Sequence, residues 1–126
     1  MLLYRKYDKE NKLDKAWFHS TNVIYSECDD IVDGLKVLRV TFKGGATYQY
    51  KDVAVGDYLM FMTGGLDGSN GKALNKYIKP KYEYTRIEDK DVGEINDEML
   101  RLKEEDANNK KEHVKEDGND KPETED

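Results

Sequence analysis

The residues best placed to do chemistry lie in one basic segment, residues 69–82. This segment carries four lysines and no acidic residue, although 27 of the 126 residues in the chain are Asp or Glu. At 100° per residue, Lys72, Lys76 and Lys79 fall on one side of a helix, and Lys81 follows closely. Ammonium groups that share one face attract phosphate, so the spacing predicts an anion-binding surface. An ordinary solvated helix face is the alternative.

The loop before this helix adds weaker signals for anion binding. Free amides and the helix dipole at the helix start favour a negative charge near Ser69. The segment is not a Walker phosphate loop, because that pattern needs glycine at position 66 and Ser or Thr at 73, where the chain has Leu66 and Ala73. The predicted ligand-binding residues here are Ser69, Asn70, Gly71, Lys72, Asn75, Lys76, Lys79 and Lys81.

A second candidate site is the triplet Tyr48-Gln49-Tyr50, whose role depends on the hairpin before it. Residues 38–42 and 46–50 alternate apolar and polar side chains around Lys43-Gly44-Gly45, which predicts two paired strands. A two-residue turn would place both tyrosines beside Arg39, as a stacking platform for nucleic acid. A three-residue loop would place Tyr48 opposite Val40 and Tyr50 opposite Leu38, with both rings mainly in the core. Burial of the apolar face favours the three-residue loop, and Arg39, Tyr48 and Tyr50 stay in the predicted ligand-binding set.

No catalytic residues, metal ligands or cofactor-binding residues are predicted. The sequence has two histidines, and nothing places the single Cys28 beside His19. The carboxylates of residues 29–33 lack the spacing of an EF-hand loop, so a solvated acidic turn is favoured there over a cation site. The chain is therefore predicted to be a binding protein and not an enzyme.

Charge divides the chain into two parts. Residues 1–87 carry 14 Lys and Arg against 11 Asp and Glu, whereas residues 88–126 carry 7 against 16. A mildly basic domain is thus followed by an acidic extension. A lone cysteine fits a reducing compartment, and the sequence has neither a signal-peptide core nor an apolar run long enough for a membrane helix. We therefore expect a soluble, cytoplasmic protein that does not bind membranes.

The elements that would position these residues form a small α+β domain. The patterns predict an antiparallel sheet of three to four strands, with one or two short helices between residues 53 and 79. The predicted organisation is an N-terminal arm or edge strand at 1–16, the domain at 17–88, a short amphipathic helix at 89–104 and a disordered acidic tail at 105–126. The apolar stripe within residues 92–102 makes an oligomer conceivable, although it is short for a coiled coil.

The order of these residues resembles the KTSC domain, named for the C-terminus of certain lysyl-tRNA synthetases and built around a central Tyr-x-Tyr. The resemblance runs from about His19 to Ile87. It rests on Ser20-Thr21-Asn22-Val23-Ile24, Leu38 to Gly45, Tyr48-Gln49-Tyr50, and Ser69-Asn70-Gly71-Lys72-Ala73-Leu74-Asn75. Ala54 departs from a usual proline, and Leu74 from a common aromatic residue. The resemblance implies a small sheet-plus-helix domain, of a kind found alone in bacterial and phage proteins, with RNA binding suggested and no activity established.

Three functional hypotheses follow from these features. The leading one is non-enzymatic binding of RNA or single-stranded DNA through the lysine-rich helix face. An alternative is a phage protein that acts in the host cytoplasm and sequesters a small nucleotide defence signal. Another is a protein-interaction module that inhibits a host enzyme, with an acidic tail that mimics nucleic acid.

Overall fold

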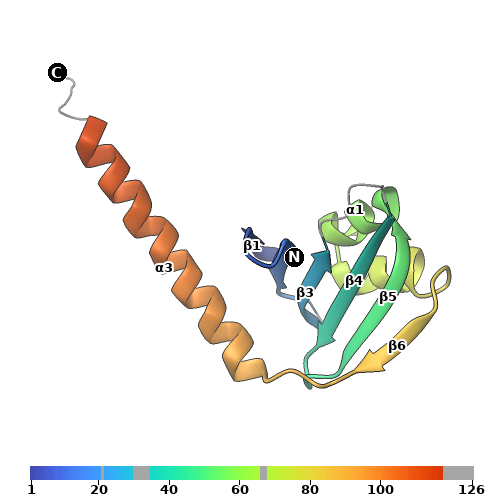
Figure 1. The fold of residues 1–126 in the computed structure, drawn as a ribbon. Helices are drawn as coiled ribbons and strands as arrows, with labels where there is room; N and C mark the ends of the chain where they lie inside the picture. Colours follow the sequence, from blue (N-terminus) through green and yellow to red (C-terminus); the bar gives the residue numbers. More distant parts are fainter. Residues whose placement is uncertain (21, 30–34, 66–67, 118–126) are drawn as a thin grey trace. The chain divides into compact units, whose positions relative to one another are not determined.

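The computed structural model describes residues 1–20, 22–29, 35–65 and 68–117. The chain divides into two compact units, residues 1–95 and residues 96–126, and each is described by itself. The first unit is an antiparallel six-stranded sheet whose strands follow one another in sequence order (Figure 1). Its strands are β1 (Leu2–Asp8), β2 (Leu13–Phe18), β3 (Val23–Asp29), β4 (Leu35–Phe42), β5 (Thr47–Ala54) and β6 (Tyr84–Ile87). The predicted α+β class is confirmed.

Two helical segments separate β5 from β6 and lie on one face of the sheet (Figure 1). Helix α1 (Val55–Thr63) ends at Gly64, whose left-handed backbone (φ 85°) lets its N–H reach the carbonyls of the last turn. Helix α2 (Asn70–Ala73) begins at Ser69, whose hydroxyl accepts the Lys72 N–H, and it continues as a π-helical turn, η2 (Leu74–Ile78). The predicted helix start at Ser69 is confirmed.

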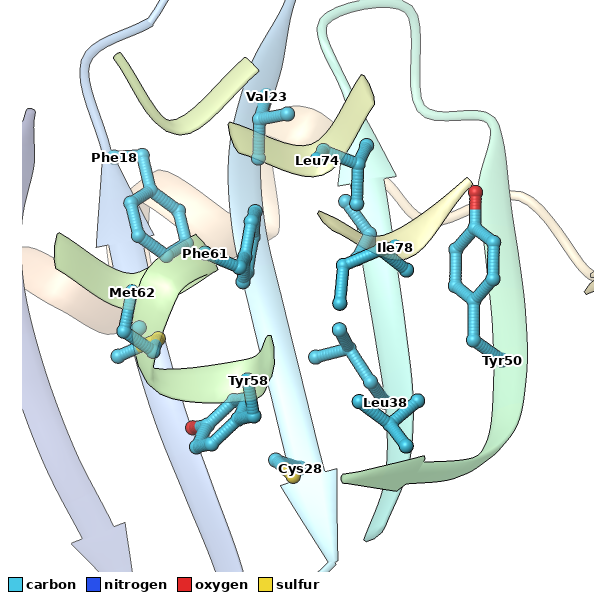
Figure 2. Packing of buried hydrophobic residues seen from close by; sticks show 13 residues of the cluster. Phe18, Val23, Cys28, Leu38, Tyr50, Tyr58, Phe61, Met62, Leu74 and Ile78 are labelled. Carbon is cyan, nitrogen blue, oxygen red and sulfur yellow. The ribbon is translucent and has the colours of Figure 1, made fainter. Parts of the chain in front are cut away.

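The hydrophobic core fills the space between these helices and the sheet, as Figure 2 shows. Alternate residues of β3, β4 and β5 point into it, because successive side chains of a strand face opposite ways. The largest buried members are Phe18, Leu38, Tyr50, Tyr58, Phe61, Leu74 and Ile78. We call this side of the sheet the helix-covered face, and the side that carries Arg39 and Gln49 the polar face.

The β4–β5 hairpin adopts the register that the sequence favoured. Tyr48 lies opposite Val40, Tyr50 lies opposite Leu38, and the Phe42 N–H donates to the Ala46 carbonyl. Residues 43–45 form the loop, and Gly45 takes the left-handed conformation with φ 97°. The three-residue loop is confirmed, and it places both tyrosines on the helix-covered face.

The sheet is wider than predicted, with six strands where three or four were expected. β1 and most of β2 come from residues assigned to the arm, for which only an edge strand had been considered. Ion pairs across the two strands accommodate their charged side chains: Arg5 lies 2.6 Å from Asp14, and Lys15 lies 3.2 Å from Asp8. Because these charges neutralise one another across the ladder, the segment can be a strand without the apolar alternation on which the prediction depended.

Helix α3 (Val92–Asp117) continues past residue 104, the predicted end of the amphipathic helix. Residues 105–117 include three Glu and three Lys, which favour a helix. An ion pair of 2.9 Å between Arg101 and Glu105, four residues apart, also supports it. Residues 118–126, and most of the predicted acidic turn at 29–34, lie outside the described residues.

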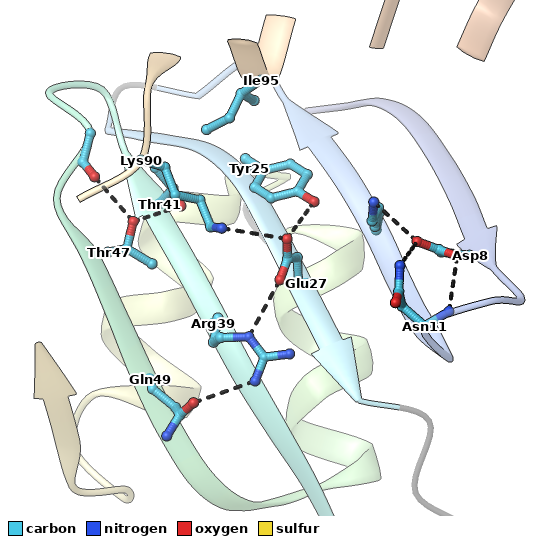
Figure 3. Close-up of polar contacts among 12 residues, drawn as sticks. Asp8, Asn11, Tyr25, Glu27, Arg39, Thr41, Thr47, Gln49, Lys90 and Ile95 are labelled. Carbon is cyan, nitrogen blue, oxygen red and sulfur yellow. Dashed lines mark hydrogen bonds and ion pairs between the residues drawn. The ribbon is translucent and has the colours of Figure 1, made fainter. Parts of the chain in front are cut away.

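The segment that leads into α3 is attached to the polar face of the sheet, as Figure 3 shows. The Lys90 N–H donates to the Gly45 carbonyl at 2.9 Å, and its ammonium group lies 3.6 Å from the Glu27 carboxylate. Ile95 is 6% exposed, and its carbonyl accepts a 2.9 Å hydrogen bond from the indole of Trp17. The folded domain therefore extends to Ile95, beyond the predicted boundary at 88.

This attachment predicts that Ile95 contributes to the stability of the sheet. We expect Ile95→Ala to lower the free energy of unfolding by about 2 kcal/mol, because a buried aliphatic side chain is removed. The matched control is Leu100→Ala in the same helix, where the side chain is 60% exposed, and its effect should stay within about 0.5 kcal/mol. Urea denaturation measures both. Equal effects of the two substitutions would contradict the attachment.

Candidate functional site

Four aromatic rings form a row across β4, β5 and β6 on the helix-covered face. Tyr84 is paired with Tyr50 across the β5–β6 ladder, so both side chains lie on the same face. Adjacent ring centroids in the row are 5.6 Å apart for Phe42 and Tyr48, 5.2 Å for Tyr48 and Tyr84, and 6.2 Å for Tyr84 and Tyr50. Tyr84 is 62% exposed. The row therefore runs from the core to an exposed edge of the sheet.

A pocket of about 260 Å³ opens within this row, and we call it the tyrosine pocket. It is lined by Tyr48, Tyr50, Lys79 and Tyr84. The ammonium group of Lys79 also lies 5.5 Å from the centre of the Phe42 ring, within the range of a cation–π contact. The pocket thus combines aromatic walls with one positive charge.

The Tyr50 hydroxyl is a hydrogen-bonding group without a partner among the residues that the structure describes. Tyr50 is only 1% exposed, and its ring lies beside Ile78 with the hydroxyl directed away from Leu38 (Figure 2). Burial, with smaller effects of Tyr48 and Tyr84, raises the pKa of Tyr50 to about 12. The hydroxyl stays protonated at neutral pH, and it can donate to an acceptor that enters the pocket.

Three lysines of the predicted anion-binding segment are exposed, and one of them, Lys79, lines this pocket. Lys72, Lys76 and Lys79 are exposed, and no carboxylate among the described residues forms an ion pair with them. Lys81 differs, because its ammonium group lies 3.1 Å from Asp57, whose carboxylate also accepts the Tyr82 hydroxyl at 2.6 Å. We define the lysine face as Lys72, Lys76 and Lys79. Lys81 is already engaged in holding the segment before β6 to α1.

The π-helical turn η2 determines where Lys79 lies. The Lys79 N–H donates to the Leu74 carbonyl, five residues earlier, at 2.9 Å. A turn with this pattern holds one more residue than an α-helical turn, so the residues after it are rotated from the positions that 100° per residue predicts. Lys79 therefore lines the tyrosine pocket and also belongs to the lysine face.

The polar residues at the start of α2 are engaged within the fold. Asn70 is buried, and its side-chain amide donates to the carbonyls of Phe61 and Met62 at 2.7 and 3.1 Å, where it satisfies the end of α1. A side chain at Gly71 would meet the Ser20 hydroxyl at 3.1 Å, so this position is tightly packed. Ser69 caps the helix, and Asn75 is exposed beside the lysine face.

Arg39 lies on the polar face, away from the tyrosine pocket. Its guanidinium group forms ion pairs with Asp29 at 2.6 Å and Glu27 at 3.4 Å, and it donates to Gln49 (Figure 3). Glu27 also accepts the Tyr25 hydroxyl at 2.9 Å. Because adjacent side chains of a strand point to opposite faces, Arg39 cannot share a site with Tyr48 and Tyr50 in this register.

A larger pocket of about 510 Å³ lies at the other end of the helix-covered face. Its carboxylates are already paired: Asp14 accepts hydrogen bonds from Arg5 at 2.6 Å and from the Tyr58 hydroxyl at 2.8 Å. Asp29, which also lines it, is paired with Arg39. Lys36 also lines this pocket and, like Lys79 in the tyrosine pocket, has no ion-pair partner among the described residues. The tyrosine pocket is distinguished by its three tyrosine walls, so it is the stronger candidate for a base.

The described part of the chain shows neither a candidate metal site nor a helix that could span a membrane. Within it, no group of three or more His, Cys, Asp and Glu side chains is arranged to hold a metal ion. None of the helices described combines the length and the apolar character that crossing a membrane requires.

The comparison with known families gives one match. Residues 34–82 match the model of the KTSC domain. Over this range, which is less than half of the chain, the sequence is similar to the KTSC family. No curated protein matches the chain. The matched range includes β5, α1, α2 and η2, and with them the lysine face, Tyr48 and Tyr50.

Two residues beyond the range that matches the family model belong to the candidate site and were missed in the sequence. Tyr84 closes the tyrosine pocket, and the guanidinium group of Arg86 lies 5.9 Å from the centre of the Tyr48 ring. Both lie on β6, after residue 82. Their alternation with Thr85 was visible in the sequence, but only the β5–β6 register shows that they face Tyr50 and Tyr48.

The structure predicts that Asn70 acts on the stability of the fold and not on a ligand. We expect Asn70→Ala to lower the free energy of unfolding by about 2 kcal/mol, because two buried carbonyls at the end of α1 lose their donor. Asn75→Ala, five positions later on the exposed side, should change it by less than about 0.5 kcal/mol. Thermal or urea unfolding compares the two. Similar small effects would show that Asn70 is not a structural cap.

Proposed function

We propose that this protein binds single-stranded nucleic acid, RNA or DNA, without catalysing a reaction. The observation that carries the proposal is the position of Lys79, which belongs both to the lysine face and to the tyrosine pocket. Proteins that bind single strands combine positive charge along the backbone with aromatic rings on which bases stack. The two features are adjacent here, and one side chain joins them.

The lysine face supplies the contacts to phosphate in this proposal. Lys72, Lys76 and Lys79 are exposed and have no carboxylate partner among the described residues, so a phosphate does not have to displace an existing ion pair. Arg86 is paired with Asp89 at 3.1 Å and is a weaker candidate for the same reason. Lys81, held by Asp57, is not included.

The tyrosine pocket supplies the contact to a base. Tyr84 is the most exposed ring of the row, and it stands edge-on to Tyr48 with an interplanar angle of 89°. An exposed phenol ring at the mouth of a pocket can stack on a base, which contributes about 1–3 kcal/mol. Bases of a duplex are paired and stacked on one another, so a pocket of this kind favours single strands.

The lysine face gives the most direct test. We expect Lys72→Gln, Lys76→Gln and Lys79→Gln together to weaken the binding of a single-stranded oligonucleotide and to flatten its dependence on salt. Each lost phosphate contact removes about 0.7 from the slope of log K against log salt, so the slope should fall by about two. Fluorescence anisotropy over a salt series measures it. Glutamine is a good helix former, so the fold should survive.

The matched control for this experiment removes three lysines elsewhere in the chain, as Lys9→Gln, Lys12→Gln and Lys103→Gln. It changes the net charge equally but leaves the lysine face intact. A similar loss in both triple variants would mean that net charge alone governs binding. Unchanged binding in the first variant, with its fold verified, would overturn the proposal and favour a protein partner.

The acidic C-terminal segment should compete with nucleic acid. Residues 105–126 carry nine acidic residues against four lysines, and these carboxylates can screen the lysine face. We expect a chain that ends at residue 104 to bind oligonucleotides several-fold more tightly at low salt, with the difference lost at high salt. Its melting temperature should stay nearly constant, because the truncation leaves the unit of residues 1–95 intact. Weaker binding after truncation would instead favour the protein-interaction alternative.

A further inference from the structure

We propose that the pocket of about 510 Å³ beside α1 is a docking site for a peptide segment of another protein, one that carries an apolar side chain next to a carboxylate. We call it the α1 pocket, and its lining comes from β1 to β4 and from α1. This inference does not depend on the proposed function, because the α1 pocket shares no lining residue with the tyrosine pocket.

The walls of the α1 pocket include apolar side chains that the fold leaves exposed. Tyr7, Val55 and Leu59 line the pocket, and they are 42%, 38% and 46% exposed. Leu35, at the start of β4, is exposed as well, and its strand partner Ala54 directly precedes α1. Single apolar side chains scattered over a surface are normal, whereas several gathered around one pocket are typical of an interaction site.

The sequence of α1 explains why two of these side chains stay at the surface. The helix packs on the sheet through Tyr58, Phe61 and Met62, which are buried. Val55 and Leu59 are four residues apart and lie together on the flank of this buried stripe. The apolar face of α1 is thus wider than the area that the sheet covers. A partner that covers this flank would remove apolar surface from water, which favours binding.

The charges of the α1 pocket select the chemistry of the partner. Both carboxylates in the lining, Asp14 and Asp29, are already paired with an arginine. Lys36 has no ion-pair partner among the described residues, and its ammonium group lies 5.7 Å from the centre of the Tyr58 ring. An incoming carboxylate would gain a partner at Lys36, whereas an incoming cation would have to displace an arginine. The pocket is therefore complementary to an acidic segment.

A peptide fits this combination better than a nucleic acid does. Surfaces that bind nucleic acid need several cations that follow the phosphate backbone. Of the cations that line the α1 pocket, Arg5 is paired with Asp14, so Lys36 is left as the cation without a described carboxylate. A peptide can place an apolar side chain against Val55 and Leu59 and a carboxylate at Lys36. An apolar centre with a charge at its rim is the usual composition of a protein interface.

The test selects ligands from a display library of random dodecapeptides, with the full chain as the target. We expect the enriched peptides to share an apolar residue next to Asp or Glu. One representative peptide is then synthesised, and its affinity is measured by fluorescence anisotropy. Leu59→Gln and Lys36→Glu should each weaken binding by about tenfold, an effect typical of a central interface contact. Leu59 is exposed and glutamine favours a helix, so the fold should survive.

The charge of Lys36 allows a reciprocal experiment. Replacing the acidic residue of the synthetic peptide with lysine should weaken its binding to the unmodified chain and restore its binding to Lys36→Glu, because the two charges are exchanged. The matched control is Lys43→Glu, which reverses the charge of an exposed lysine outside the pocket lining. This control should bind the original peptide as the unmodified chain does.

The outcomes separate this inference from nucleic-acid binding and from self-association. No enriched peptide, or enriched peptides without an acidic residue, would overturn it, as would binding that survives both Leu59→Gln and Lys36→Glu. Loss of peptide binding when Lys72, Lys76 and Lys79 are replaced by Gln would place the peptide on the lysine face and overturn it too. A dimer in sedimentation velocity that Leu59→Gln dissociates would assign the pocket to a second copy of the chain and overturn the peptide partner.

Discussion

The conformation of Gly45 is the constraint on which the rest of the site depends. Its backbone has φ 97°, and a side chain there would lie 2.6 Å from the carbonyl oxygen of Lys90. Glycine is therefore required both by the hairpin loop and by the segment that crosses it. With the three-residue loop fixed in this way, β4 and β5 pair in the register that turns Tyr48 and Tyr50 towards the helices. A shift by one residue would place both rings among Arg39 and its acidic partners, and the tyrosine pocket would not form.

The same pairing explains which parts of the fold could be predicted from the sequence. Residues 38–50 alternate strictly, and the glycines mark the loop, so local pattern and long-range burial give the same answer there. The helix start at Ser69 and the stop at Gly64 are local as well, since each depends on hydrogen bonds within four residues. β1 and β2 could not be predicted in this way. Arg5, Asp8, Asp14 and Lys15 belong to a strand only because each finds its opposite charge on the neighbouring strand.

The site was predicted less completely than the fold, for two physical reasons. The wider turn of η2 rotates Lys79 from the position that a regular α-helix would give it. The helix propensities of residues Leu74–Ile78 do not predict a π-helical turn. The pairing of Tyr84 with Tyr50 joins residues 34 positions apart, so it depends on how the helices between them pack. The individual tyrosines and lysines were visible in the sequence. Their meeting in one pocket depends on tertiary structure and cannot be obtained from spacing along the chain.

The tyrosine pocket also differs in kind from the rest of the polar structure. Asp14, Glu27 and Asp57 each accept from two or three donors, and these contacts link the strands to helix α1 and to the segments before β6 and α3. The Tyr50 hydroxyl, in contrast, lies in the lining of the tyrosine pocket and has no hydrogen-bond partner among the described residues. The hydroxyl lies in the same pocket as the unpaired ammonium group of Lys79, at the inner end of an aromatic row that reaches the surface. A ligand site needs this arrangement, with apolar walls for contact and a few fixed polar groups for orientation.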